Sequence, residues 1–137
     1  MSDLTFKEYQ ETAITDVYFK TTDLINSLVK DLALNDIQRE QVKTLIHVSQ
    51  IEFLSLGLAE ESGEVAGKIK KIIRNNNCNF TVENINELSK ELGDVLWYLT
   101  ALIKELRLTL GEVAFQNILK LKARKQNGTI IGTGDNR

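Results

Sequence analysis

Proline is absent from this 137-residue sequence, and cysteine and histidine occur only once each. Without proline, nothing in the chain forces a helix to end early, so long helices are allowed. The single Cys78 cannot form an internal disulfide, and with His47 alone it cannot complete a structural zinc site. We therefore expect a helix-rich cytoplasmic protein with neither disulfide nor zinc support.

Long apolar stretches and a charge excess are missing as well. No stretch approaches the roughly 20 apolar residues of a membrane helix, and no secretion signal opens the chain. The formal net charge of −2 argues against nucleic acid or a membrane surface as a partner, because both need a basic excess on one face. The length fits a single domain, residues 1–137, whose burial an oligomer would complete.

Helix-start signals divide the chain into segments. Each pairs a capping side chain with an acid or amide three residues later; the pairs are Thr5 with Glu8, Asn35 with Gln38, and Thr109 with Glu112. Apolar residues recur every three to four positions between these signals. We predict helices at 6–33, 36–56, 57–74, 82–107 and 110–126, with the second and third able to form one continuous helix.

Asparagines and glycines predict the loops. Residues 75–79 read Asn-Asn-Asn-Cys-Asn, and asparagine competes for backbone hydrogen bonds and tolerates left-handed geometry. The helices on either side should therefore form an antiparallel hairpin. Residues 128–137 have no helical period and contain glycines at 128, 132 and 134, which predicts a flexible C-terminal tail. The expected fold class is all-α.

Two similar acidic motifs lie on the two helices of this hairpin. Residues 58–65 read Leu-Ala-Glu-Glu-Ser-Gly-Glu-Val, and residues 88–95 read Leu-Ser-Lys-Glu-Leu-Gly-Asp-Val. At 100° per residue, Glu61 and Glu91 lie at the margin of their apolar stripes, with Glu64 and Asp94 one step further round. Antiparallel pairing would bring these four carboxylates to one level, and Glu60 would add a fifth.

Such a cluster favours a divalent cation. Clustered carboxylates at the edge of a core are costly without a compensating cation, and oxygen ligands suit Mg²⁺ or its substitute Mn²⁺. The alternative to a metal site is a solvent-exposed acidic face on which Glu64 pairs with Lys68. Gly63 and Gly93 each cost roughly 1 kcal/mol of helix propensity, which indicates close approach of backbone or ligand, or tight helix packing.

The arrangement Glu61-x-x-Glu64 followed by Glu91-x-x-Asp94 resembles the signature of the MazG-like all-α nucleoside triphosphate pyrophosphohydrolases, and the resemblance extends over about residues 56–137. It implies Mg²⁺-dependent hydrolysis of a nucleoside triphosphate between its α and β phosphates. It also implies a homo-oligomer, a dimer or tetramer, built on antiparallel four-helix bundles. The implied catalytic residues and metal ligands are Glu61, Glu64, Glu91 and Asp94, with Glu60 as a further metal ligand.

The substrate-binding candidates each have a structural alternative. They are Lys68, Lys71, Tyr98, Asn117, Lys120, Arg124 and Arg137. Lys68 and Lys71 are placed to contact pyrophosphate or to pair with surface acids, and Tyr98 to contact the sugar or to lie at the edge of the core. The basic residues near 120–125 contact phosphate or complement the end of a helix. We also expect residues 128–137 to close as a lid, with Arg137 or Asn136 on the nucleotide.

Trp97 and His47 receive no catalytic role. The helical wheel places Trp97 opposite the leucine stripe, facing a second subunit or solvent. We interpret His47 as a partly buried polar residue.

Two other readings of the sequence stay open. One is a non-enzymatic helical interaction module whose acidic strip engages a basic protein. The other keeps the chemistry but acts on a phosphoribosyl-ATP-like or modified nucleotide. A di-iron carboxylate site is excluded because His47 has no acidic residue three positions before it, and a P-loop is excluded because its motif is absent.

Overall fold

A computed structural model describes residues 4–14 and 20–127. Within these residues the chain forms helices only, which confirms the all-α prediction. The helices are α1 (Phe6–Ala13), α2 (Lys20–Val29), α3 (Asp36–Asn75), α4 (Val82–Glu105) and α5 (Leu110–Gln126). None of them combines the length and the apolar character needed to cross a membrane.

The helix starts follow the local sequence closely. All three predicted capping boxes form, at Thr5, Asn35 and Thr109, and the hydroxyl of Thr81 caps α4 by accepting from the backbone N–H of Asn84 at 3.3 Å. The predicted asparagine loop joins α3 to α4, and Asn77 takes a left-handed φ of 51° there. These ends depend on contacts between neighbouring residues, so the sequence alone specifies them.

The predicted helix at 6–33 is wrong. The chain instead forms α1 and α2, and α1 ends where Ile14 leaves helical geometry at φ −114° and ψ 52°. The indole N–H of Trp97 donates to the carbonyl of Ala13 at 3.1 Å, and the Lys104 ammonium donates to the carbonyl of Ile14. Side chains of α4 therefore take carbonyls that a longer helix would use itself. By contrast, the two helices predicted at 36–56 and 57–74 form the single helix α3.

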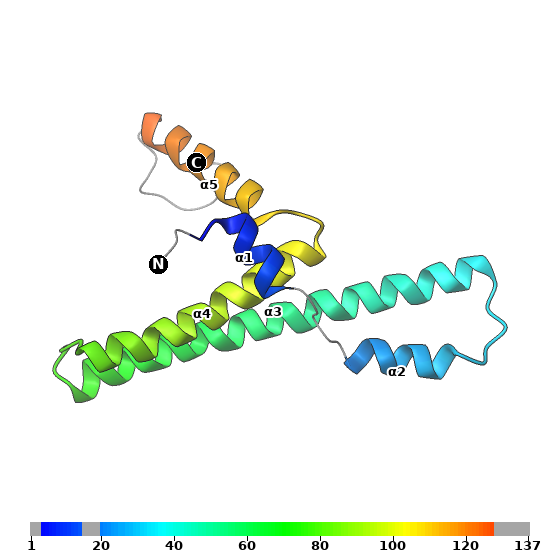
Figure 1. The fold of residues 1–137 in the computed structure, drawn as a ribbon, viewed down its shortest axis with the longest axis horizontal. Coiled ribbons are helices and arrows are strands. Elements are labelled where there is room, and N and C mark those ends of the chain that lie inside the picture. The colour runs from blue at the N-terminus through cyan, green and yellow to red at the C-terminus, as the bar shows by residue number, and fades with distance from the viewer. Residues whose placement is uncertain (1–3, 15–19, 128–137) are drawn as a thin grey trace.

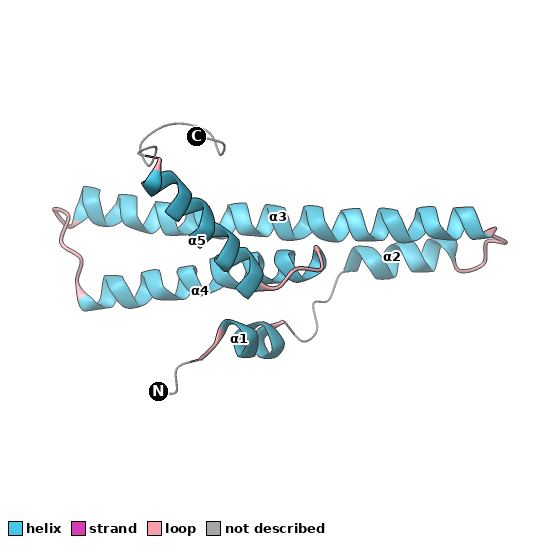
Figure 2. Cartoon of the chain, turned by 90° about the horizontal axis from the view of Figure 1, so that it is seen from above, coloured by secondary structure: helices cyan, strands magenta, loops and turns pink. Residues whose placement is uncertain are grey.

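The antiparallel hairpin of α3 and α4 organises the molecule (Figure 1, Figure 2). α1 and α5 lie by the C-terminal end of α4, and α2 packs beside the N-terminal part of α3. Gln10 ties α1 to the start of α5, because its amide donates to the carbonyl of Leu108 at 3.3 Å and accepts from the N–H of Leu110 at 3.0 Å. The four-helix core stays a prediction, since α2 and α4 pack beside different lengths of α3.

The core lies where the residue after α1 meets the hairpin of α3 and α4. Ile14, Leu54 and Ala101 are buried there, and Trp97 and Tyr98 pack against them. The Trp97 and Tyr98 rings meet edge to face with centroids 5.0 Å apart. The prediction that Trp97 faces solvent or a second subunit is therefore wrong, because its indole packs within the chain and hydrogen-bonds to α1.

The close approach expected at the motif glycines occurs at a different glycine. A Cβ added to Gly57 would lie 2.1 Å from the Tyr98 ring, whereas one added to Gly63 or Gly93 would meet no atom within 4 Å. Gly57 is therefore needed for the contact between α3 and α4. Within the described part of the chain, the space beside the two motif glycines is open.

These glycines give a matched pair of substitutions. We expect Gly57→Ala to lower the free energy of unfolding by about 1–3 kcal/mol, because the Tyr98 ring must leave the core. Gly63→Ala should raise it by up to about 1 kcal/mol, because alanine is the better helix former and meets no neighbour. Urea unfolding followed by circular dichroism measures both. Equal shifts of the two variants would contradict the described packing.

Candidate metal centre

The hairpin places the two acidic motifs opposite each other. α3 carries Glu61 and Glu64, and α4 carries Glu91 and Asp94. Glu61, Glu64 and Glu91 each present a carboxylate oxygen, and these three oxygens lie within 4.8 Å of one another. Two consecutive helices thus bring three of the predicted acids to one point. We call these three residues the acidic triad.

Asp94 and Glu60 border the acidic triad without belonging to it. Asp94 is near enough to α3 that its charge raises the pKa of Glu61, and near enough to α1 that it raises that of Tyr9 after the larger effect of burial. Glu60 is exposed and has a smaller effect on Glu61 than Asp94 and Glu64 have. Asp94 is therefore the nearer candidate for a fourth ligand.

Like charges perturb the acidic triad. Partial burial raises the pKa of Glu61 above its ordinary value of 4.5, and the charges of Asp94, Glu64, Glu60 and Glu91 raise it further. Each neighbouring carboxylate disfavours ionisation of the next, and a cation among them would reverse this effect. The electrostatics of the cluster therefore favour a bound cation.

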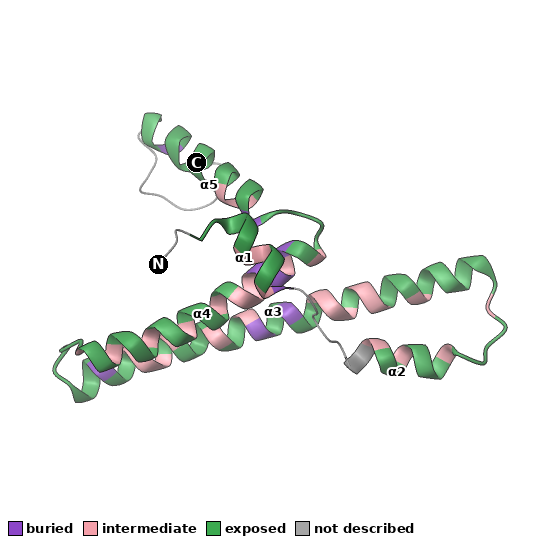
Figure 3. Ribbon diagram, in the orientation of Figure 1, coloured by how far each residue is buried: buried purple, intermediate pink, exposed green. Residues whose placement is uncertain are grey.

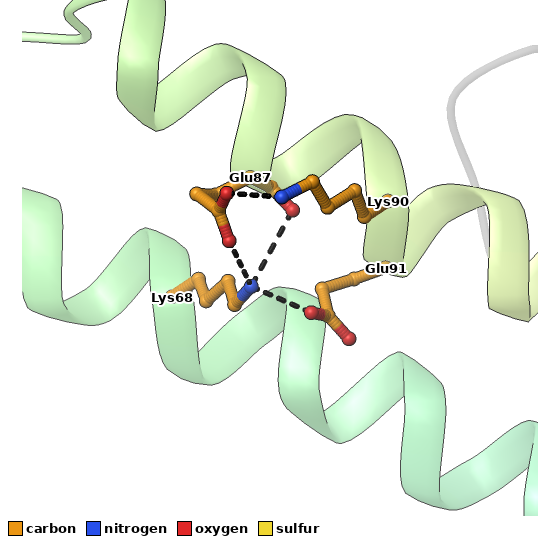
Figure 4. A network of polar contacts seen from close by, with 4 residues as sticks. All are labelled: Lys68, Glu87, Lys90 and Glu91. Carbon is orange, nitrogen blue, oxygen red and sulfur yellow. Dashed lines mark hydrogen bonds and ion pairs between the residues drawn. The ribbon is translucent and has the colours of Figure 1, made fainter.

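Lys68 supplies part of this positive charge. Its ammonium donates to Oε1 of Glu91 at 2.5 Å and lies 3.5 Å from Oε2 of Glu87, whose Oε1 accepts from Lys90 (Figure 4). The hydrogen bond from Lys68 holds the pKa of Glu91 below 4.5. Lys68 thus pairs across the hairpin with Glu91 of α4. The alternative of a solvent-exposed acidic face had paired it with Glu64 of its own helix. Sequence reasoning missed Glu87, although it precedes Glu91 by four residues on the same helix face.

The donor set fits a hard divalent cation. Carboxylate oxygens are the ligands that Mg²⁺ and Mn²⁺ prefer. Three or four carboxylates leave part of an octahedral shell for water and for oxygens of a phosphate substrate. Glu61 and Glu91 are half-buried and Glu64 is exposed, so the group is open to solvent on one side.

The other predicted substrate residues lie at different distances from the acidic triad. Lys71 is exposed and lines a hollow of about 260 Å³ together with Lys68 and Glu87. Asn117 and Lys120 line a separate hollow of about 480 Å³ on α5. The structure therefore brings Lys68 into contact with Glu91 of the acidic triad, places Lys71 in the hollow beside Lys68, and places Asn117 and Lys120 in a separate hollow.

Three further residues have a structural setting of their own. Arg124 is buried at 8% exposure, and Tyr98 packs its ring on Gly57 and the core. His47 is half-buried, as predicted, with Nδ1 2.7 Å from a Glu105 oxygen. Arg137 and the rest of the predicted tail lie outside the described residues.

Tyr9 is a neighbour of the site that sequence reasoning did not single out. It lies on α1, which packs against α4 and α5, and its pKa is raised by burial and by the charge of Asp94. The only signal in the sequence is its position within the capped helix that begins after Thr5. Contact between α1 and α4 is tertiary, so helical periodicity could not reveal it.

Comparison with known proteins agrees with the position of the acidic motifs. A family model described as the MazG nucleotide pyrophosphohydrolase domain matches residues 49–129. Gene 37 protein of Mycobacterium phage L5 is 42% identical over 90 residues, which are 66% of this chain and 79% of that protein. No solved structure matches the chain. The matched range contains both motifs and leaves α1 and α2 outside.

The contact between Lys68 and Glu91 predicts how the pKa of Glu91 changes when Lys68 is substituted. In metal-free protein, Lys68→Met should raise the pKa of Glu91, because it removes the hydrogen bond that lowers this pKa most. A lowered pKa stabilises the folded state above pH 4.5 and this stability is lost as pH falls through the folded value. The variant should therefore lose less stability in acid. Carboxyl-carbon NMR of Glu91 measures the shift.

The matched control is Lys70→Met, which removes an exposed lysine of the same helix and should leave the Glu91 titration unchanged. An unaltered Glu91 pKa in Lys68→Met would show that the contact does not persist in solution.

Proposed function

The chain belongs to the MazG nucleotide pyrophosphohydrolase family, and from this premise we propose that it hydrolyses a ribo- or deoxyribonucleoside triphosphate between the α and β phosphates. The products are the nucleoside monophosphate and pyrophosphate. The observation that carries the proposal is the acidic triad, whose oxygens lie within 4.8 Å of one another on the two motif helices. A Mg²⁺-dependent enzyme needs such a group of hard oxygen donors next to open space for phosphate.

Four carboxylates are the proposed metal ligands. Glu61, Glu64 and Glu91 would hold Mg²⁺, or Mn²⁺ in its place, with Asp94 as the fourth ligand and Glu60 at the periphery. When bound, the ion would neutralise charge on the triphosphate and make water a better nucleophile. The fit is supported by the raised pKa of Glu61, which reflects its partial burial and, after that, the charges of the neighbouring carboxylates.

Glu61 is the proposed base. It is half-buried beside Glu64 and Glu91, and a carboxylate positioned at a metal centre is a suitable proton acceptor for the attacking water. We assign it the orientation of the attacking water and acceptance of a proton at a carboxylate oxygen. Glu91 serves this role less well, since its charge is already engaged by Lys68.

Lys68 and Lys71 are the proposed contacts to the pyrophosphate part of the substrate. Both line the hollow next to Glu87, and an ammonium group is a suitable point charge for phosphate oxygens. Asn117, Lys120, Arg124 and Arg137 stay candidates for the rest of the nucleotide. Tyr98 has the weaker case, because its ring packs into the core. A homo-oligomer based on four-helix bundles is part of the same proposal.

Removing a single ligand tests the proposal. We expect Glu64→Gln and Asp94→Asn to lower the rate of pyrophosphate release by at least about a hundredfold at subsaturating Mg²⁺. Circular dichroism should show an unchanged fold, because both substitutions relieve repulsion between carboxylates. Glu52→Gln, an exposed acid of the same helix outside the motif, is the control and should keep full activity. Near-normal activity in either ligand variant would contradict the assignment.

The assay should cover the common ribonucleoside and deoxyribonucleoside triphosphates, with identification of both products. Release of orthophosphate would contradict cleavage between the α and β phosphates. Absence of Mg²⁺-dependent turnover with every nucleotide, including modified ones, would favour the interaction module.

Truncation after Asn127 tests the proposed lid. Removal of residues 128–137 should raise KM or lower kcat for the preferred nucleotide, because a lid excludes water and contacts the substrate. Mg²⁺ affinity, followed separately by calorimetry, should stay nearly constant because the ligands lie on α3 and α4. Unchanged kinetic constants would remove the tail from the site.

A further inference from the structure

Lys68 is a cation that the chain itself places at the acidic triad. It lies four residues after Glu64, one helical turn further along α3, and its ammonium donates to Oε1 of Glu91 at 2.5 Å. The Lys68 and Glu91 side chains are 28% and 14% exposed, in keeping with the partial burial along the facing sides of α3 and α4 (Figure 3). A partly buried ion pair is screened less than a surface pair. Lys68 therefore neutralises much of the charge of Glu91 in the metal-free protein.

Glu91 is also a proposed ligand of the metal. Mg²⁺ and an ammonium on one carboxylate would repel each other, and this repulsion is strong where water is partly excluded. A doubly charged ion with several carboxylate ligands prevails over a singly charged ammonium with one. Binding of Mg²⁺ at Glu91 would therefore displace the ammonium of Lys68.

Glu87 offers the ammonium a second acceptor. It precedes Glu91 by four residues, so the two acids lie one turn apart on the same face of α4. Nζ of Lys68 lies 3.5 Å from Oε2 of Glu87 and 3.4 Å from the Glu87 carbonyl oxygen (Figure 4). The ammonium thus lies between two acids and is closer to Glu91. Because a lysine side chain is flexible, a small rotation makes Glu87 the nearer partner while the helices keep their places.

Lys90 holds Glu87 in position for this exchange. Its ammonium donates to Oε1 of Glu87 at 2.5 Å, which leaves Oε2 of the same carboxylate toward Lys68. The Lys90 and Glu87 side chains are 67% and 52% exposed, so this pair lies at the rim of the hairpin. The acceptor for Lys68 is therefore oriented by the chain before any ligand binds.

The second position of Lys68 lies at the hollow proposed for the pyrophosphate part of the substrate. Lys68, Lys71 and Glu87 line this hollow of about 260 Å³. An ammonium that leaves Glu91 for Glu87 stays at the hollow, where its charge adds to that of Lys71. Two lysines at one hollow attract an anion with several negative charges, such as pyrophosphate.

The second acceptor strengthens metal binding. A ligand shifts the equilibrium between two positions of a side chain only by the difference in its affinity for them. Without Glu87, Mg²⁺ would have to drive the ammonium away from every carboxylate of α4 that it contacts. With Glu87, the displaced ammonium keeps an ionic partner. The charge of Glu91 is engaged throughout, first by Lys68 and then by the metal.

We propose that Lys68 is an exchangeable counter-ion of the metal centre, which pairs with Glu91 in the metal-free protein and passes to Glu87 when Mg²⁺ binds. Glu87 is the positioning residue for this exchange, although it lies outside both acidic motifs. The exchange couples occupation of the metal centre to the presence of a free lysine charge at the hollow. The identity of the metal and of the anion rests on the proposed function, and the exchange itself is measured without turnover.

Magnesium binding in the absence of nucleotide tests the exchange. Titration calorimetry of the full chain should show that Lys68→Met binds Mg²⁺ at least about fivefold more tightly than wild type, because the competing ammonium is gone. Glu87→Gln should bind it roughly fivefold more weakly, because the displaced ammonium has lost its second acceptor. Lys70→Met removes an exposed lysine of the same helix and should keep the wild-type affinity. Circular dichroism should show equal helix content in all four proteins.

A double-mutant cycle separates the exchange from a simple effect of charge. In a chain that carries Lys68→Met, the further substitution Glu87→Gln should change the Mg²⁺ affinity by less than about twofold, because no ammonium then needs the acceptor. If the Glu87 carboxylate acted on the metal only through its own negative charge, its removal would weaken binding equally with and without Lys68.

Carboxyl-carbon NMR follows the exchange directly. Addition of Mg²⁺ should move the Glu87 resonance in the wild-type chain, because the ammonium of Lys68 comes closer, and should leave this resonance in place in Lys68→Met. Pyrophosphate added with Mg²⁺ should bind more weakly to Lys68→Met than to wild type, whereas the Lys70→Met control should bind it as wild type does.

Two results would overturn the exchange alone. Weaker or unchanged Mg²⁺ binding by Lys68→Met would show that Lys68 does not compete with the metal. An equal loss of affinity from Glu87→Gln in both backgrounds would show that Glu87 acts only as a nearby charge. Absence of Mg²⁺ binding by the wild-type chain would instead contradict the proposed function, and the exchange with it.

Discussion

The pairing of α3 with α4 sets the position of every carboxylate in the candidate metal centre. The loop between Asn75 and Val82 reverses the chain, and the Gly57 contact with Tyr98 fixes how closely the helices approach. The carboxylate oxygens of Glu61, Glu64 and Glu91 then lie within 4.8 Å of one another, where their negative charges repel strongly. Repulsion between these carboxylates opposes the packing of α3 against α4. The rest of the hairpin must therefore be stable enough to keep the two helices paired. A bound cation would replace the repulsion between the carboxylates by their common attraction to the metal.

Much of the fold could be predicted because it depends on neighbouring residues. The capping boxes at Thr5, Asn35 and Thr109 and the asparagine loop formed as the sequence indicates. The end of α1 could not be predicted, because Trp97 and Lys104 reach its last carbonyls from a distant helix. The helical wheel misplaced Trp97 for the same reason. A wheel gives the direction of a side chain from its own helix, but it does not show which other helix packs on that side.

The candidate site follows a similar division. Equal motif spacing on two antiparallel helices was sufficient to predict that Glu61, Glu64 and Glu91 would meet. The pairing of Lys68 with Glu91 depends on the lateral offset of the helices, which sequence periodicity does not specify. The place of the α5 residues depends on how α5 leaves the hairpin after Arg107, whose φ is 60°. Such a turn changes the direction of a whole helix through one residue.

Because α3 is one continuous helix, it sets the distance between the residues that it carries. An α-helix rises about 1.5 Å per residue, so the 20 positions from Gln41 to Glu61 correspond to about 30 Å along one stiff element. The part of α3 beside α2 is therefore separated from the acidic triad by several turns of a single helix. Among the described helices α2 contacts only α3, so a change in the packing of α2 would be transmitted to the carboxylates along this one helix alone.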